Sequence, residues 1–212
     1  MARVSRLETR LSAANCGLVM FDALNGYLHP KDPEKQKFLA ERNILTNMQR
    51  LLAGARKVGM TSFYPSGSHA ADGSDTVSRL TDTDMDLNPK ATKPIQPPFF
   101  KDHAASGIAT EVAPIAGDVV VPKHRWNSLF QTDLDLHFRV RGIETMIICS
   151  GSTDVGIASM VYAARDMDYG IVVVSDCCYS TRGNNNQFFM ERVFPRMGRV
   201  MTVGQAVGLM AP

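Results

Sequence analysis

Apolar positions along the chain alternate between short unbroken runs and longer stretches with helical spacing. A short run of β-branched and other apolar residues, bounded by Gly, Pro, Ser or Asp, is typical of a strand that is covered on both faces. Six such runs predict strands at residues 16–22, 60–65, 117–123, 144–151, 171–178 and 198–202. Apolar residues with helical periodicity predict helices within residues 33–59, 132–142, 153–170, 184–195 and 202–210.

This alternation is the pattern of strands joined by helical crossovers. We therefore predict an α/β fold, with a three-layer, doubly wound, mostly parallel six-stranded sheet and helices on both faces. The 212 residues show no internal repeat and no linker, which predicts one domain over residues 1–212. Residues 1–15 are expected to form an amphipathic arm that packs on the domain or on a second subunit. Residues 66–100, rich in Ser, Asp, Gly and Pro, are expected to be a functional loop or lid.

Charge and cysteine content narrow the class of partner. The chain has 23 Lys and Arg against 21 Asp and Glu, and a net charge of +2 gives no electrostatic reason to expect nucleic acid or an anionic membrane. No apolar run approaches the ~20 residues of a membrane span, and no secretory signal is evident. The four cysteines lie outside any CxxC or Cys/His ligand spacing, so we expect free buried thiols in a cytoplasmic protein.

Polar residues stand at the carboxyl ends of several predicted strands, where open α/β sheets bind ligands. Asp22, Lys123 and Asp176 each end a strand, and the turn 150–156 follows another. Each has a structural explanation when taken singly, such as a helix cap or a solvated charge. Their joint placement predicts a functional site at this edge.

Three motifs at these strand ends carry a resemblance to a family. "LVMFDALNGYL" contains Asp22 and Asn25, and "VPKHRWNSLFQTDL" places Lys123 ahead of Trp126 and F-x-T-D-L. "SGSTDVGIASM" contains Thr153, Asp154 and Gly156. With "VFPRMGRV", these segments resemble the isochorismatase-like hydrolases, which include nicotinamidases, N-carbamoylsarcosine amidase, ureidoacrylate hydrolases and isochorismatases.

The resemblance implies a catalytic pair, Asp22 and Lys123, and a cis peptide at Gly151–Ser152 before the turn. Amide-cleaving members carry a nucleophilic Cys where this chain has Gly156, and isochorismatases carry Gly. Without a thiol, covalent attack on an amide is closed unless another nucleophile reaches the same point. Gly156 is expected to leave room for water beside Asp22, and its N–H to serve as an oxyanion donor.

Several reactions stay open for such a site. Asp22 can act as a general acid on a vinyl ether, or as a base that activates water on an ester, lactone or imide-like carbonyl. Burial raises and Lys123 lowers the pKa of that carboxyl, and the sequence does not say which effect is larger. The alternatives are an amide or ureido hydrolase whose nucleophile comes from elsewhere, and a catalytically silent binding protein of the same fold.

Aromatic residues are expected to form the pocket walls, with Trp126 either stacked on a ligand or buried in the core. The candidate substrate-binding residues are Asn25, Tyr27, Phe99, Trp126, Ser152, Thr153 and Val155, with Phe100 as a further wall. Candidate carboxylate-binding residues are Arg79, Lys101, His103 and Arg125.

No metal and no cofactor are expected. His69 has no Asp two residues before it and no His nearby in sequence, so we expect a solvent-facing loop histidine rather than a ligand. The first strand is not followed by GxGxxG, so no dinucleotide is implied. The chain is therefore expected to be a hydrolase of a small cyclic or carboxylated molecule that assembles as a dimer or tetramer.

Overall fold

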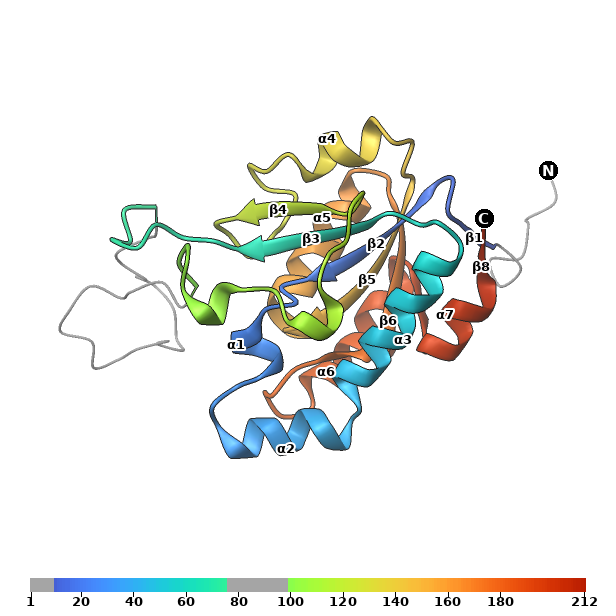
Figure 1. Ribbon diagram of the computed structural model, residues 1–212. Coiled ribbons are helices and arrows are strands. Elements are labelled where there is room, and N and C mark those ends of the chain that lie inside the picture. The colour runs from blue at the N-terminus through green and yellow to red at the C-terminus, as the bar shows by residue number, and fades with distance from the viewer. Residues whose placement is uncertain (1–9, 76–98) are drawn as a thin grey trace.

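The computed structural model describes residues 10–75 and 99–212, and its centre is one parallel sheet (Figure 1). The strand order is β4-β3-β2-β5-β6-β7, and every pair is parallel. The strands are β2 Cys16–Phe21, β3 Ser62–Gly67, β4 Val119–Lys123, β5 Thr145–Gly151, β6 Gly170–Tyr179 and β7 Arg199–Met201. This order confirms the predicted doubly wound α/β fold.

Helices cover both faces of the sheet and form two apolar clusters. Buried residues of α3 (Ile44–Lys57) and α7 (Val203–Leu209) pack on one face, and those of α4 (Leu134–Arg139) and α5 (Ala158–Asp166) pack on the other. Strand β2 contributes to both clusters, because successive side chains point to opposite faces. Leu18 and Met20 face α3, whereas Val19 and Phe21 lie in the other cluster.

Helix boundaries differ from the predicted ranges where the backbone turns. The helix expected over 33–59 is two helices, α2 (Pro33–Glu41) and α3, because Asn43 between them is left-handed with φ 53°. The helix expected over 153–170 begins as a π-helical turn, Thr153–Ile157, and continues as α5. The remaining short elements are α1 Asn25–Leu28, α6 Asn185–Phe188, a π-helical turn Phe189–Val193 and 3₁₀ turns at Ala104–Ser106, Thr110–Val112 and Phe194–Arg196.

The expected loop 66–100 begins later than predicted, because β3 continues to Gly67. Gly67 pairs with Lys123 at the end of β4, and this parallel pairing holds the last residues of β3 in the sheet. Residues 76–98, most of the predicted lid, lie outside the described residues.

The described part of the N-terminal arm packs on the same domain. β1 (Leu11–Ser12) pairs in parallel with β8 (Met210–Ala211), and Ala13 N–H donates to the Ala211 carbonyl at 2.8 Å. Leu11 is fully buried in the α3–α7 cluster. Figure 1 shows the C-terminus beside β1. The arm therefore joins the two ends of the described chain. Within residues 10–75 and 99–212, no helix has the length and apolar character needed to cross a membrane.

We expect Leu11→Ala to lower the free energy of unfolding by about 2–5 kcal/mol, because it empties a fully buried site. Urea denaturation measures the change. Val140→Ala, at a side chain that is 67% exposed, is the control and should alter it by less than about 0.5 kcal/mol. An equal effect of the two substitutions would contradict the structural role of the arm.

Candidate active site

Asp22 and Lys123 meet at the carboxyl ends of β2 and β4. Lys123 Nζ donates to Asp22 Oδ2 at 2.7 Å, and both side chains are about 7% exposed. β3 lies between the two strands and supplies a third group, the Gly67 N–H, which donates to Asp22 Oδ1 at 2.8 Å. Asp22 itself is left-handed, with φ 43°. Both carboxylate oxygens are thus held by the two neighbouring strand ends.

Burial raises the pKa of the Asp22 carboxyl above its ordinary value, although the Lys123 ammonium and the Gly67 N–H act in the opposite direction. A carboxyl with a raised pKa holds a proton more readily, and a general acid or base must both accept and return a proton. The geometry therefore suits Asp22 to proton transfer.

The turn after β5 has the conformation that the resemblance implies, with a cis peptide between Gly151 and Ser152. The space next to Gly156 is different from what we expected. A Cβ built on Gly156 would lie 2.5 Å from both Cε1 and Cζ of Phe21. The expectation that Gly156 leaves room for water is therefore wrong at this point, because the Phe21 ring fills that room. Sequence reasoning overlooked Phe21, although a bulky residue directly before Asp22 was a visible signal.

No thiol replaces the missing side chain. All four cysteines are free and buried, as expected. Cys149 and Cys178 lie on β5 and β6, close to the site in sequence, and burial raises the pKa of each thiol. Both thiols are therefore protonated at neutral pH and are poor nucleophiles.

A cavity of about 330 Å³ lies at this edge of the sheet. Tyr27 and Phe99 form one wall, with ring centroids 4.4 Å apart, and the Tyr179 hydroxyl donates to the Tyr27 carbonyl at 3.2 Å. The cavity is lined by Gly26, Tyr27, Pro30, Lys35, Leu39, Phe99, Ser152, Tyr179, Thr181 and Arg182. Two of these residues are cationic and none is acidic. Gly67 connects the cavity wall to the buried pair, since a Cβ there would lie 3.5 Å from Phe99 Cβ and 3.6 Å from Asp22 Oδ1.

Of the predicted substrate-binding residues, Tyr27, Phe99 and Ser152 line this cavity. Asn25 instead donates to the Ala104 carbonyl at 3.2 Å, and Thr153 Oγ1 donates to Asn186 Oδ1 at 2.6 Å. Trp126 is 63% exposed, so it is not a core residue, and neither it nor Val155 is among the lining residues.

The other polar candidates have structural contacts. Asp176 Oδ1 accepts from the Val203 N–H at 2.7 Å and so holds the start of α7. Arg125 donates to the carbonyls of Asp75 and His124, and His103 Nδ1 accepts from the Ala105 N–H. Lys101 is exposed, and Phe100 stacks on His103 with centroids 4.6 Å apart. Arg79 lies outside the described residues.

Asp154 organises the loop that follows β6, a role that the sequence did not indicate. Ser152 Oγ donates to Asp154 Oδ1, and Asn185 Nδ2 donates to Oδ2 at 2.7 Å. Arg182, which lines the cavity, lies 3.6 Å from the same carboxylate and donates to Ser152 Oγ at 3.4 Å. Burial alone would raise the pKa of Asp154, but hydrogen bonds from Ser152, Asn185 and Ser180 hold it below its ordinary value.

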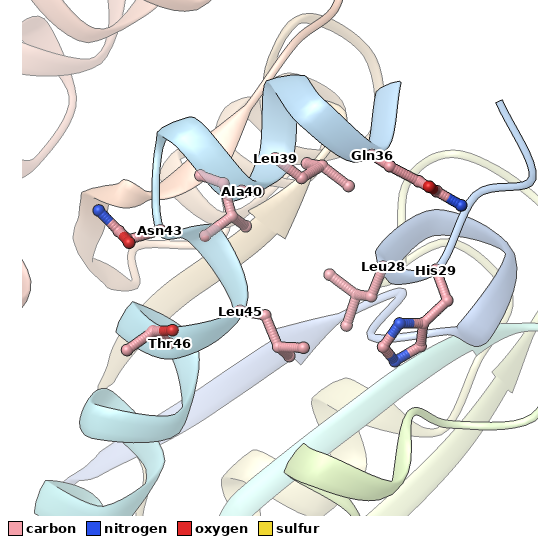
Figure 2. A pocket seen from close by; sticks show the side chains of 9 residues that line it. Leu28, His29, Gln36, Leu39, Ala40, Asn43, Leu45 and Thr46 are labelled. Carbon is pink, nitrogen blue, oxygen red and sulfur yellow. The ribbon is translucent and has the colours of Figure 1, made fainter. Parts of the chain in front are cut away.

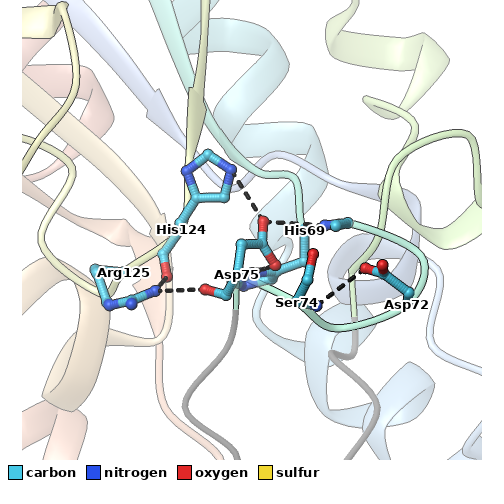
Figure 3. A network of polar contacts seen from close by, with 7 residues as sticks. His69, Asp72, Ser74, Asp75, His124 and Arg125 are labelled. Carbon is cyan, nitrogen blue, oxygen red and sulfur yellow. Dashed lines mark hydrogen bonds and ion pairs between the residues drawn. The ribbon is translucent and has the colours of Figure 1, made fainter.

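His69 has partners that come from elsewhere in the chain, so the expectation of a solvent-facing loop histidine is wrong. Its Nδ1 lies 3.3 Å from Asp75 Oδ1, and His124 Nε2, after β4, lies 3.2 Å from Asp75 Oδ2 (Figure 3). Adjacent parallel strands end side by side, which brings the two histidines together. Across the described ranges, no group of three or more His, Cys, Asp or Glu side chains is arranged to hold a metal ion.

A second cavity, of about 460 Å³, lies away from the buried pair. Figure 2 shows Leu28 and His29 facing Leu39, Gln36 and Leu45 across it. Its walls come from α1, α2 and α3. Neither cavity is lined by Asp22 or Lys123, but of the two only the smaller one is lined by the predicted substrate-binding residues Tyr27, Phe99 and Ser152, so we assign the smaller one to the candidate active site.

Comparison with known proteins is consistent with this arrangement. The sequence model described as "Isochorismatase domain" matches residues 16–205. The isochorismatase family protein YecD of Escherichia coli is 25% identical over 199 residues, covering 91% of this chain and 95% of YecD. Ureidoacrylate amidohydrolase RutB of Variovorax paradoxus is 25% identical over 214 residues, covering 95% and 84%. A solved isochorismatase family structure from Burkholderia thailandensis has a TM-score of 0.73 at 26% identity, covering 92% and 95%.

We expect Asp154→Asn to lower the free energy of unfolding by about 2 kcal/mol at pH 7, because it weakens charge-assisted hydrogen bonds. A carboxyl with a lowered folded-state pKa stabilises the protein above its unfolded-state pKa of about 4, and this contribution is lost as the pH falls. The gap between variant and wild type should therefore shrink from pH 7 to pH 3 in urea titrations. Asp166→Asn, at an exposed position of α5, is the control. A gap that is constant with pH would contradict this role of Asp154.

Proposed function

The chain belongs to the isochorismatase family of hydrolases, and we propose that it hydrolyses a small cyclic or carboxylated molecule with Asp22, Lys123 and water, without a cysteine nucleophile. The observation that carries the proposal is the buried pair itself. Asp22 and Lys123 form an ion pair at the carboxyl ends of β2 and β4, while all four thiols are buried in the core. A proton-transfer group is present, and a thiolate is not.

Asp22 transfers one proton in each of the two proposed reactions, hydrolysis of an ester or lactone and hydrolysis of a vinyl ether. With an ester or lactone, its carboxylate accepts a proton from water as the water oxygen bonds to the carbonyl carbon. The proton then passes to the leaving oxygen as the C–O bond breaks. The Gly156 N–H is the proposed donor to the oxyanion, and Lys123 offsets the negative charge that forms nearby.

With a vinyl ether, a protonated Asp22 gives its proton to the alkene carbon. Water adds to the resulting oxocarbenium carbon and returns a proton to Asp22. The adduct then breaks down to an alcohol and a carbonyl compound. The raised pKa of Asp22 supports this direction of transfer as well.

The cavity supports the substrate class. Its volume of about 330 Å³ fits a small molecule. The rings of Tyr27 and Phe99 offer a surface for a flat or cyclic group. Arg182 and Lys35 offer positive charge to a carboxylate, and Arg182 can bind it through two N–H groups.

The second candidate is amide or ureido C–N hydrolysis, which the likeness to the ureidoacrylate amidohydrolase favours. It requires a nucleophile other than residue 156. A catalytically silent binding protein is the remaining alternative, and it predicts no turnover of any substrate tried.

We expect Asp22→Asn to reduce kcat/KM by about 10²–10⁴-fold, the range of a lost general acid or base. The assay is a panel of carboxylated vinyl ethers, esters, lactones, ureido acids and primary amides. Asp176→Asn should retain activity, because the Asp176 carboxylate holds α7 and lies within β6, which continues to Tyr179, and not at the strand end that the sequence predicted. Iodoacetamide treatment of the folded enzyme should leave turnover intact. Loss of activity on alkylation would instead identify a cysteine nucleophile.

We expect Arg182→Met to raise the KM of a carboxylated substrate about 10-fold, since one charge-assisted contact is lost at a partly exposed site. The KM of its neutral methyl ester should stay unchanged. Arg165→Met, on the exposed side of α5, is the matched control for loss of a positive charge. Equal effects on the acid and its ester would rule out carboxylate recognition by Arg182.

A further inference from the structure

The Phe21 ring lies next to Gly156 and also contacts the Lys123 ammonium. We propose that Phe21 determines which chemistry this site can use: its edge occupies the volume of a side chain at position 156, and its face positions the Lys123 ammonium. The inference rests on the proposed function for the identity of the site. It makes Phe21 a specificity-determining and positioning residue, not a catalytic one.

The edge of the ring leaves no room at position 156. A Cβ there would meet Cε1 and Cζ of Phe21 at 2.5 Å, well inside van der Waals contact, whereas Cδ1 would lie at an ordinary 3.6 Å. Phe21 is 1% exposed and belongs to the α4–α5 core cluster, so its ring moves only if its neighbours move. A cysteine sulfur would extend beyond that Cβ. Position 156 is therefore restricted to glycine while residue 21 is phenylalanine.

The face of the ring carries the Lys123 ammonium. Nζ lies 4.6 Å from the ring centroid, within the ~6 Å range of a cation–π contact. The same nitrogen donates to Asp22 Oδ2 at 2.7 Å and to the Arg125 carbonyl at 3.5 Å. Carboxylate, carbonyl and ring thus hold the ammonium from three directions. Phe21 completes the contacts that keep Lys123 against Asp22.

Because of these two contacts, the mechanism depends on residues 21 and 156 together and not on Gly156 alone. A thiol at 156 requires a smaller residue at 21, and a smaller residue at 21 loosens Lys123. The site can therefore gain a covalent nucleophile only through coupled changes at both positions, and with Phe21 present water is the nucleophile available.

A double-mutant cycle tests the edge contact without any substrate. Phe21→Leu removes the two ring atoms that face position 156 and keeps the positions nearer the backbone. We expect Gly156→Ala to lower the Tm by about 5–10 °C in the Phe21 background. The same change should lower it by less than about 2 °C in the Phe21→Leu background, since neighbouring sites couple. Equal losses in both backgrounds would overturn the proposal.

Thiol labelling provides a second readout. We expect Gly156→Cys combined with Phe21→Leu to fold and to react with iodoacetamide at residue 156 at least about 10-fold faster than the four buried cysteines, because accessible thiols react and buried ones are inert. Gly156→Cys alone should show a depressed Tm or no labelling at 156. If the single variant keeps the wild-type Tm and labels as fast as the double variant, the proposal fails. If it does not fold, the alanine cycle decides.

The pH profile tests the face contact. The charged and titratable groups that face Asp22 are Lys123 from β4, His69 after β3, Tyr27 from α1 and Tyr179 from β6. Phe21→Leu leaves all of them in place but frees the ammonium. We expect the activity midpoint assigned to Asp22 to move to higher pH by about half a unit, the equivalent of one cation–π contact.

Phe138→Leu is the matched control, since Phe138 is a fully buried ring of the same core cluster that does not appear in the site. It should lower the Tm without moving the midpoint. An unmoved midpoint in Phe21→Leu would overturn the positioning role. Absence of turnover across the substrate panel would refute the proposed function, whereas the Tm cycle and the labelling would still judge the exclusion of a side chain at 156.

Discussion

Asp22 and Lys123 are two charged groups taken out of water and set 2.7 Å apart, and the architecture of the site follows from the need to compensate them. Each buried charge costs several kcal/mol unless its partner and its remaining hydrogen-bonding positions are supplied. The parallel sheet supplies them. β2 and β4 place the two residues at one edge, and the intervening β3 presents the Gly67 N–H to the second carboxylate oxygen.

The Phe21 ring next to this ion pair changes how the glycine at position 156 is interpreted. A glycine at that position suggests an empty space, yet the space is filled by the ring of the residue that precedes Asp22. The same ring lies under the Lys123 ammonium. In the function we propose, this one side chain both excludes a nucleophile at position 156 and supports the ion pair, and the proposed chemistry is proton transfer with water.

Three carboxyl groups near the carboxyl ends of the strands, those of Asp154, Asp75 and Asp22, have different surroundings. Asp154 is satisfied by Ser152 and Asn185, which fixes the loop that carries Arg182 toward the cavity. The Asp75 carboxylate lies between His69, which follows β3, and His124, which follows β4 (Figure 3). Among the carboxyl groups of residues 10–75 and 99–212, only that of Asp22 combines deep burial with a raised pKa, which is the combination expected of a group that exchanges protons.

The sequence pattern by itself predicted the six strands, their mostly parallel arrangement and the placement of Asp22 and Lys123 at one edge of the sheet, and the family resemblance implied that the two residues pair. Unbroken apolar runs identify buried strands, and crossover helices require parallel neighbours, so polar residues at strand ends must share one edge. The tertiary structure alone decided which residues meet there. Phe21 against Gly156, His124 beside His69, and Arg182 in the cavity are contacts between segments far apart in the chain. They depend on the register of the strands and on how side chains fill space, which one-dimensional patterns do not record.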